Sequence, residues 1–467
     1  MLHAKPASPK PGSRCLRCFL LSLVLISFFC LDCRRAAAPP AIKYNLLVIS
    51  IDTCRADHLT CYGYNRDTSP HLDQLAKEGV LFEDVTAASS WTVPSHMSMF
   101  TSLYPSVHKV QEASALAEGI PTLAECLAKS GYVTAAFVSA ATMNHWFGFN
   151  RGFQFYDDYT VSRSEPNQFR KVVTGHLVTE QAAKWLQKHS RENFFLFLHY
   201  FDCHGDYISP APFNEKFDPD YKGKENGRFI GMWPADKRAS VSVMDLAHIV
   251  ALYDGGIAYT DEQVGKIFQL LQDLRLSEKT LVIILSDHGE GFLEHGLFTH
   301  GNSLYEELLR VPLILRLPGV IPAGKRVAGN VSHVDLMPTV MGLLQQAGPL
   351  KMQGIDLSPA ILSDQPVPER LIYSELAYNG IYLRAVRWGD RKLLGSMKRT
   401  LAGAQLEELV GGREKVIAGA DLKKDCPEAM LRALTMGPAS IAEAKAGQAK
   451  EPDADLLSRL KSLGYAQ

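Results

Sequence analysis

The sequence lacks the features that would place it in a specialised class of protein. Its 49 Lys and Arg residues almost balance its 50 Asp and Glu residues, so it has no basic excess of the kind that nucleic-acid binding needs. It contains no internal repeat, and with 46% hydrophobic and 21% charged residues it is neither collagen-like nor fully disordered. These absences leave a globular chain of 467 residues, which is long enough to bury a large core.

Cysteine is scarce outside the first 38 residues. The five cysteines beyond that point are Cys54, Cys61, Cys126, Cys203 and Cys426. An odd and scattered set is not a disulfide framework, and it contains no C-x-x-C pair that would suggest structural zinc. We therefore expect free thiols, with a Cys54–Cys61 disulfide as the alternative if the loop between them folds back.

One long apolar run is present, and it lies near the N-terminus. Residues 18–31 follow a basic start and precede Arg34-Arg35-Ala36-Ala37-Ala38, whose small residues suit a signal-peptidase site. These 14 residues fall short of the ~20 that a transmembrane helix needs. Residues 1–38 are therefore predicted to be the signal peptide of an exported protein, periplasmic or extracellular, with an uncleaved N-terminal membrane anchor as the alternative. Without them the net charge is −6.

Beyond this leader, short apolar runs alternate with helical patterns. The runs are continuous, as in strands buried on both faces, and they span residues 45–51, 132–138, 193–200, 280–285 and 311–315. The predicted helices span residues 70–79, 121–131 and 242–274, with Ser69 and Gly79 as the ends of the first. This alternation predicts an α/β fold with a mostly parallel sheet flanked by helices.

The pattern changes after residue 347 and divides the chain. Residues 45–347 are predicted to form a catalytic domain. Residues 348–400 hold shorter strand-like pieces, 371–376 and 383–394, and are predicted to form a small C-terminal α+β subdomain. Residues 401–467 are rich in Ala, Lys, Glu and Gly and poor in large apolar residues, so a helical or mobile tail is expected.

Charged and imidazole side chains come directly after three of the predicted strands. They are Asp52, then Asp202 with His204, and then Asp287 with His288. In an open parallel sheet the ligand lies beyond the carboxyl ends of the strands. We therefore expect these side chains to meet at one site.

Two longer motifs accompany Asp52. They are S-S-W-T-V-P-S-H-M-S-M-F-T-S at residues 89–102 and S-D-H-G-E at residues 286–290. Together they resemble the sulfatase family of the alkaline-phosphatase superfamily, whose signature runs C/S-x-P-S-R and, four residues later, T-G. Family-like segments follow in the same order between Asn45 and Asp356, and the resemblance implies the alkaline-phosphatase-like fold for that region. These segments lie at residues 68–82, 199–207, 300–312 and 334–339.

The resemblance implies a catalytic site around Thr92. Thr92 matches the family's nucleophile, and Asp52, Asp287 and His288 match metal ligands, so these residues are expected to hold one divalent metal ion together with the Thr92 hydroxyl. Such an ion lowers the pKa of a nucleophile and holds an ester oxygen. The spacing agrees, because Thr92 comes just before a helix that begins near Pro94, where free N–H groups and the helix dipole face an anion.

Two residues depart from the family pattern. Sulfatases oxidise a Cys or Ser at the nucleophile position to formylglycine, and threonine cannot form that aldehyde, so no formylglycine is expected at Thr92. A covalent threonyl intermediate must instead be cleared by water, which is easier at phosphorus than at sulfur. His288 stands where sulfatases usually have Asn, and imidazole favours zinc or manganese over calcium.

Three other histidines take roles from their positions in the family pattern. His204 matches a substrate-contacting histidine and His300 a Lys or His, so each is expected to bind the anion or to protonate the leaving oxygen. His96 replaces the arginine that orients nucleophile and substrate, and it is expected to bind substrate. Asp202 with His204 and His300 is an alternative site for a second metal ion.

Three more residues have a structural interpretation. His108 and His295 are as readily explained as structural histidines, and Asp335 as a helix cap.

These observations predict an exported metal-dependent hydrolase that cleaves sulfuric- or phosphoric-ester bonds of a small-molecule or glycan substrate. Phosphate, phosphodiester and phosphonate esters are favoured over sulfate esters. One alternative is a transferase of phospho-headgroups, although such enzymes usually carry several membrane spans. The other is an inactive glycan-binding relative, which would need neither the metal set nor the nucleophile.

Overall fold

The structure is a computed structural model that describes Met1 and residues 43–111, 114–158, 174–228 and 230–438. The predicted leader, apart from Met1, and residues 439–467 of the predicted tail lie outside the described residues. None of the helices in the described ranges is long and apolar enough to cross a membrane.

An eight-stranded sheet organises the chain, in the order β10-β2-β9-β6-β1-β5-β3-β4. Every neighbouring pair is parallel except β2 with β9 and β6 with β9, so the predicted mostly parallel sheet is confirmed. The strands are β1 (Asn45–Ile51), β2 (Val80–Thr86), β3 (Val133–Val138), β4 (Phe155–Asp157), β5 (Phe194–Tyr200), β6 (Thr280–Leu285), β9 (Leu313–Arg316) and β10 (Lys325–Ser332).

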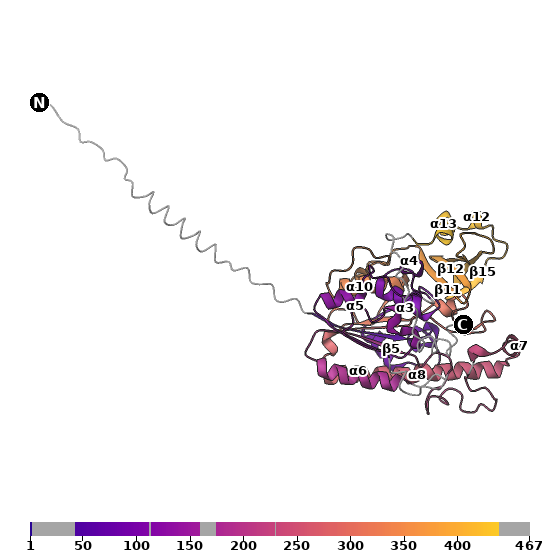
Figure 1. Ribbon diagram of the computed structural model, residues 1–467, viewed down its shortest axis with the longest axis horizontal. Helices are drawn as coiled ribbons and strands as arrows, with labels where there is room; N and C mark the ends of the chain where they lie inside the picture. The colour runs from indigo at the N-terminus through magenta and orange to yellow at the C-terminus, as the bar shows by residue number, and fades with distance from the viewer. Residues whose placement is uncertain (2–42, 112–113, 159–173, 229, 439–467) are drawn as a thin grey trace. The chain divides into compact units, whose positions relative to one another are not determined.

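Helices cover both faces of this sheet, with α3, α5 and α10 on one side and α6 and α8 on the other (Figure 1). The helices are α2 (Pro70–Glu78), α3 (Thr92–Thr101), α4 (Pro105–His108), α5 (Leu123–Lys129), α6 (Gly175–His189), α7 (Ala235–Ala239), α8 (Val243–Asp273), α9 (Glu306–Leu309), α10 (Leu336–Leu343) and α11 (Ser358–Leu362). Three of them confirm the predicted helices and their ends. Pro70 begins α2, a Thr122–Glu125 capping box begins α5, and the Ser242 side chain caps α8.

The central position of β1 in the sheet explains why its sequence is almost continuously apolar. Alternate side chains point to opposite faces of a strand, and here both faces are covered. Leu46 and Val48 pack into the core beneath α3, whereas Leu47 and Ile49 pack into the core beneath α8. Ser50 is the one polar interruption, and the alternation places it on the α3 face.

The C-terminal part is a separate antiparallel sheet in the order β11-β12-β13-β14-β15, so the predicted α+β subdomain is confirmed. Figure 1 draws it in orange and yellow, beside α12 and α13. Its elements are β11 (Ile372–Tyr378), β12 (Ile381–Trp388), β13 (Arg391–Ser396), β14 (Gln405–Val410), β15 (Arg413–Val416), α12 (Leu422–Asp425) and α13 (Glu428–Met436).

Two predictions for this region are wrong in detail. The single strand-like piece at 383–394 is two strands, because a turn at Gly389 folds β13 back onto β12. The described part of the predicted tail also supplies β14 and β15, which pair with β13, so the subdomain extends past residue 400. A strand with one buried face needs few apolar residues. Leu406 provides such a contact with the core around Leu393, and overall composition could not reveal it.

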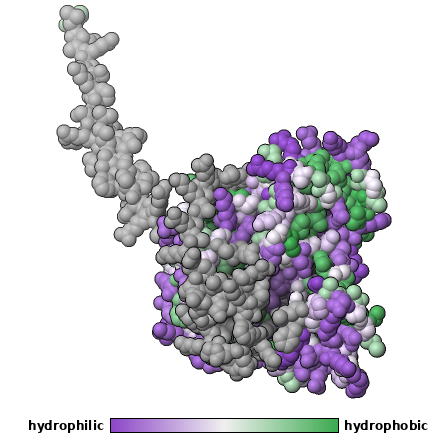
Figure 2. Space-filling model, turned by 45° about the vertical axis from the view of Figure 1, so that its right-hand side comes forward, coloured by the Kyte–Doolittle hydropathy of each residue, from purple (hydrophilic) through white to green (hydrophobic). Residues whose placement is uncertain are grey.

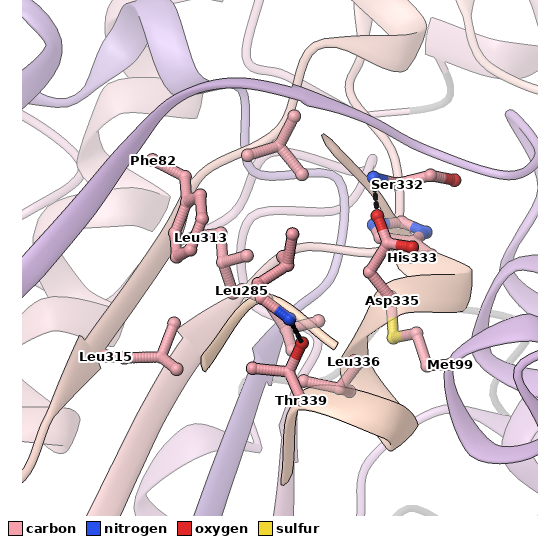
Figure 3. Close-up of a pocket in the computed structure, with 12 residues that line it drawn as sticks. Phe82, Met99, Leu285, Leu313, Leu315, Ser332, His333, Asp335, Leu336 and Thr339 are labelled. Atoms are coloured by element: carbon pink, nitrogen blue, oxygen red, sulfur yellow. Dashed lines mark hydrogen bonds between the residues drawn. The ribbon is translucent and has the colours of Figure 1, made fainter. Parts of the chain in front are cut away.

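A small cavity lies within the core, between the sheet and the α3 side of the fold (Figure 3). Its volume is about 20 Å³, roughly the space of one water molecule. Met99 and Leu285 contribute apolar walls, and His333 and Asp335 a polar one. The Asp335 carboxylate accepts hydrogen bonds from the backbone of Ser332 and Ile355, at 2.8 Å each, and it precedes α10. Asp335 is thus structural, but its side chain caps the turn at His333–Asp335 and makes no capping hydrogen bond to α10, which it was predicted to cap.

Polar residues cover most of the visible surface, and apolar residues gather in its upper right part (Figure 2). The exposed large apolar residues of the C-terminal subdomain are Tyr382, Val410, Val416 and Met436.

Met99 is a buried side chain on the core-facing side of α3, so its truncation should destabilise the fold. Met99 is 1% exposed and already borders a cavity, and Met99→Ala should lower the free energy of unfolding by about 2–5 kcal/mol. Met244→Ala removes an equal side chain that is 75% exposed, and should change the same free energy by less than about 0.5 kcal/mol. Urea denaturation followed by circular dichroism measures both. Equal effects of the two variants would contradict this packing.

Candidate active site

The ends of β1 and β6 bring two carboxylates and an imidazole together. These strands are parallel neighbours in which Ser50 pairs with Leu285, so Asp52 and Asp287 both lie two residues beyond this pair. Asp52, Asp287 and His288 are fully buried, and each offers a ligand atom within 4.8 Å of those of the other two. The three predicted metal-ligating side chains therefore converge.

The hydrogen bonding of Asp287 supports a cation at this position. Its Oδ1 atom accepts hydrogen bonds from the backbone N–H groups of Thr53 at 3.2 Å and His288 at 3.0 Å. Its Oδ2 atom is buried and has no hydrogen-bond donor, although ring nitrogens of His288 and His96 lie 3.3 and 3.5 Å away. A buried anionic oxygen without a donor is costly, and a divalent metal ion would satisfy it. The donor set of two carboxylates and one imidazole suits such an ion.

Thr92 lies at the first position of α3, beside this cluster. Its Oγ1 atom is 3.3 Å from Nε2 of His288. The first turn of an α-helix leaves backbone N–H groups without helical partners, and the positive end of the helix dipole favours an anion there. The structure thus places the predicted nucleophile between the predicted metal ligands and a helix N-terminus.

The Ser95 side chain fixes the start of α3 against the end of β6. Its hydroxyl donates to the backbone oxygen of Asp287 at 2.6 Å, and its oxygen lies 2.9 Å from Nδ1 of His333. Burial lowers the pKa of His333 to about 3, so this imidazole is neutral near pH 7. Movement of the helix would therefore break hydrogen bonds in a fully buried region.

The prediction that His96 binds substrate is not supported by this geometry. His96 is fully buried, with Nε2 2.8 Å from the Ser50 hydroxyl and Nδ1 3.0 Å from the backbone oxygen of Thr92. Both ring nitrogens are thus used inside the protein. Burial lowers its pKa to about 4, against the opposing effect of Asp287. His96 lies one helical turn after Thr92 and contacts its backbone oxygen.

His204 and His300 do lie where the sequence predicted, in a row of rings that begins at His288. The ring centroids of His288 and His300 are 4.4 Å apart, and those of His300 and His204 are 4.7 Å apart. The His204 ring stacks on Phe201 at 4.1 Å. Nδ1 of His300 lies 3.0 Å from Oε1 of Glu290, which leaves the other ring nitrogen available.

Asp202 does not join these histidines. Its Oδ1 atom accepts a hydrogen bond of 3.0 Å from the backbone of Thr174, at the start of α6. Among the residues that the structure describes, no group with metal-ligand spacing contains Asp202, His204 and His300 together. The structure thus does not group the three residues of the alternative second metal site, and the Asp202 carboxylate is held at the N-terminal turn of α6.

Sequence reasoning missed two residues of the site. Nε2 of His199 lies 3.1 Å from Oδ2 of Asp52, and burial lowers the pKa of this histidine to about 4. Glu290 is fully buried and orients His300. The residue opposite Ser50 in the neighbouring strand must lie on the same face of the sheet, and that residue is His199. Identifying it requires the register of β1 and β5, which cannot be read from the sequence.

Gly289 allows the 286–290 segment to pass close to α9. A Cβ atom at this position would lie 2.0 Å from the backbone oxygen of Glu307, and the Gly289 N–H donates to the backbone oxygen of Leu308 at 2.9 Å. A side chain here would have to displace the backbone that carries His288 and Glu290.

Comparisons with known proteins agree with this geometry. The model of the Sulfatase family matches residues 44–346. The chain belongs to the sulfatase family. Among curated sulfatases, the uncharacterized sulfatase YidJ of Escherichia coli strain K12 is 26% identical over 343 residues, which cover 64% of this chain and 67% of that protein. Iduronate 2-sulfatase of Mus musculus is 26% identical over 417 residues, which cover 72% and 75% respectively.

Solved structures show the same fold. Phosphonate monoester hydrolase of Agrobacterium radiobacter has a TM-score of 0.66 and 21% identity, over 78% of this chain and 89% of that one. A protein solved with its substrate D-glucosamine-2-N,6-O-disulfate has a TM-score of 0.70 and 16% identity, over 84% and 97%. The chain is therefore a sulfatase-family hydrolase, and this family generally binds a divalent metal ion.

His108 provides a test of the buried polar network beneath α3. The imidazole is buried between the Ser98 hydroxyl, the backbone oxygen of Pro94 and the backbone N–H of Val110, in agreement with a structural role. Burial lowers its pKa to about 3. Because the unfolded chain binds a proton near pH 6.5 and the folded chain does not, His108 should weaken stability as pH falls from about 6.5 to about 3.

His108→Gln should therefore flatten the pH dependence of stability. The slope of the free energy of unfolding against pH should fall by about 1.4 kcal/mol per pH unit between pH 4 and 6. Chemical denaturation at several pH values measures that slope. An unchanged slope would show that His108 is protonated in the folded protein.

Proposed function

We propose that this sulfatase-family hydrolase uses Thr92 as a covalent nucleophile on phosphate, phosphodiester or phosphonate esters. The observation that carries the proposal is the position of the Thr92 hydroxyl, 3.3 Å from His288 at the N-terminus of α3 and beside the buried Asp52 and Asp287. A binding protein would need neither a placed hydroxyl nor this cluster.

Asp52, Asp287 and His288 are the proposed ligands of one divalent metal ion, together with the Thr92 hydroxyl. When bound, such an ion would lower the pKa of the hydroxyl and hold one oxygen of the ester. One imidazole among the ligands favours Zn²⁺ or Mn²⁺ over Ca²⁺. His199 would hold Asp52 in the orientation that binding requires, through its contact of 3.1 Å with Oδ2.

The reaction has two steps. In the first, the Thr92 oxygen releases its proton to solvent and attacks phosphorus, the bond from phosphorus to the leaving oxygen breaks, and His300 or His204 protonates the departing alcohol. In the second, water attacks phosphorus, the same histidine takes the proton of that water, and the Thr92 oxygen leaves and regains a proton. Glu290 keeps the His300 ring oriented through both steps.

The preference for phosphorus rests on the residue at position 92. A formylglycine hydrate expels sulfate through its second hydroxyl, which threonine lacks, so a threonyl ester must be cleared by attack of water on the central atom. Structural similarity to phosphonate monoester hydrolase supports the preference. Sulfate esters are the competing substrate class, because the curated relatives include sulfatases that act on glycans.

We also propose that the protein is exported, on the evidence of residues 1–38. The remaining chain has a net charge of −6. An anionic substrate, either a small molecule or a glycan ester, must therefore be attracted by the local charges at the site and not by the protein as a whole.

The hydroxyl of Thr92 should be essential for turnover. Thr92→Ala should lower kcat on 4-nitrophenyl phosphate, bis(4-nitrophenyl) phosphate or 4-nitrophenyl phenylphosphonate by about 10³-fold or more, and Thr92→Ser should retain part of it. Thr101→Ala is the matched control, because Thr101 ends the same helix and its hydroxyl bonds only to the backbone of Met97. Release of 4-nitrophenol measures all four proteins.

The same panel separates the competing functions. Turnover of 4-nitrophenyl sulfate that is lost in Thr92→Ala would overturn the preference for phosphorus esters. Binding of a sulfated glycan without turnover of any ester would identify an inactive relative. Transfer of the phosphoryl group to added alcohol in preference to water would identify a transferase.

Protonation by His300 should depend on the leaving group. His300→Ala should lower kcat/KM by about 10²–10⁴-fold for an ester whose leaving alcohol has a high pKa. The loss should be much smaller for a 4-nitrophenyl ester, whose leaving oxygen needs little protonation. His204→Ala measured in parallel identifies which of the two histidines donates. Equal losses for both kinds of ester in both variants would assign these histidines to binding alone.

A further inference from the structure

A second cluster of metal-ligand type lies outside the active site. Nδ1 or Nε2 of His295 and carboxylate oxygens of Glu307 and Glu414 all lie within 4.8 Å of one another. His295 lies between β7 (Gly291–Phe292) and β8 (Phe298–Thr299), which form a hairpin, and Glu414 lies in β15. We call these three residues the hairpin cluster. It joins the catalytic domain to the C-terminal sheet.

The side chains of the hairpin cluster are held in place. Nδ1 of His295 lies 2.8 Å from Oε1 of Glu307, and the His295 ring stacks on Tyr305 with centroids 3.8 Å apart. The side chains of Glu307 and Glu414 are only 7% and 3% exposed, whereas that of His295 is 30% exposed. The imidazole thus closes the solvent side of a pair of largely buried carboxylates.

A neighbouring carboxylate shows that positive charge is in short supply here. Glu407 in β14 is fully buried, and neither of its carboxylate oxygens has a hydrogen-bond donor. Its carboxylate faces the Lys392 ammonium at 3.7 Å, the same group that contacts Glu414 at 2.6 Å and Glu306 at 3.1 Å. Glu306 also lies 3.7 Å from the Arg387 guanidinium, so Lys392 is the cation that Glu407 and Glu414 share. Buried anions require closer compensation than this.

We propose that the hairpin cluster binds a divalent metal ion through His295, Glu307 and Glu414, with the Glu407 carboxylate adding negative charge beside it. One imidazole and two carboxylates are a donor set suited to Zn²⁺ or Mn²⁺. The ion supplies the positive charge that Lys392 alone does not provide. The site is separate from Asp52, Asp287 and His288, and the proposal does not depend on the reaction at Thr92.

The ion would have a structural consequence for the active site. The hairpin consists of two short strands, β7 and β8. β8 ends at Thr299, immediately before His300. A ligand on the hairpin, one on α9 and one on β15 would tie the hairpin and α9 to a distant strand of the C-terminal sheet. Metal binding to such a site stabilises the folded state by binding it in preference to the unfolded state.

Native mass spectrometry of the full chain tests the proposal. The protein is stripped with EDTA, loaded with a small excess of Zn²⁺ and, separately, of Mn²⁺, and the ions bound per chain are counted. We expect His295→Ala and Glu414→Gln each to bind one ion fewer than the wild type, and Asp287→Asn to keep the hairpin ion. Glu414→Gln keeps an oxygen acceptor for Lys392 and removes only the negative charge.

His189→Ala is the matched control. His189, the last residue of α6, also pairs with a glutamate, Glu192, but no third ligand from the described part of the chain joins them, so the ion count of His189→Ala should equal that of the wild type. Isothermal titration should show at least a tenfold loss of affinity at the hairpin site in His295→Ala, and the rise in Tm on adding metal should shrink with it.

The outcomes are distinct. Unchanged ion counts in both His295→Ala and Glu414→Gln would overturn the proposal, whatever happens at Thr92. Loss of all bound metal in Asp287→Asn, confirmed as folded by circular dichroism, would also overturn it. Loss of the ion in His295→Ala alongside an intact count in Asp287→Asn would support the hairpin site and contradict the active-site ion.

Discussion

Two buried carboxylates placed side by side are the constraint on which the rest of the structure depends. The parallel pairing of β1 with β6 forces Asp52 and Asp287 to the same point, where water does not reach them. Like charges in such a place require compensation. The surroundings supply it through backbone N–H groups, an adjacent helix N-terminus and nearby imidazoles. The resulting concentration of oriented donors can also hold a tetrahedral anion.

Much of this arrangement could be predicted from the sequence, because it depends on local patterns. Continuous apolar runs identify strands covered on both faces, and residues directly after such strands must lie at one edge of the sheet. That reasoning located Asp52, Asp287 and His288, and the family signature located Thr92. The order of the strands could not be predicted by that reasoning, because β9 inserts antiparallel between β2 and β6 and no local sequence pattern encodes this position.

The remaining parts of the site depend on pairing between distant segments. His96 looks from its motif like a substrate ligand, but only the structure reveals that Ser50 and the backbone of Thr92 occupy its two nitrogens. His199 reaches Asp52 because the strand register places it opposite Ser50. The strands β14 and β15 were missed for a different reason: Leu406 of β14 contacts the small core around Leu393, β15 has no buried residue, and composition averaged over the tail conceals both strands.

The central position of β1 has a consequence for how the protein is made. Its two partners in the sheet begin at Phe194 and Thr280, so β1, the first strand of the sheet to leave the ribosome, must wait for both. At typical rates of synthesis the wait for β6 is roughly 10–50 s. Until β5 emerges, the nascent chain carries an apolar strand with two unpaired edges, and one edge stays unpaired until β6 follows. Such an edge is a target for aggregation and for chaperones. Asp52, Asp287 and the helix that begins at Thr92 therefore come together only when synthesis of the catalytic domain is nearly complete.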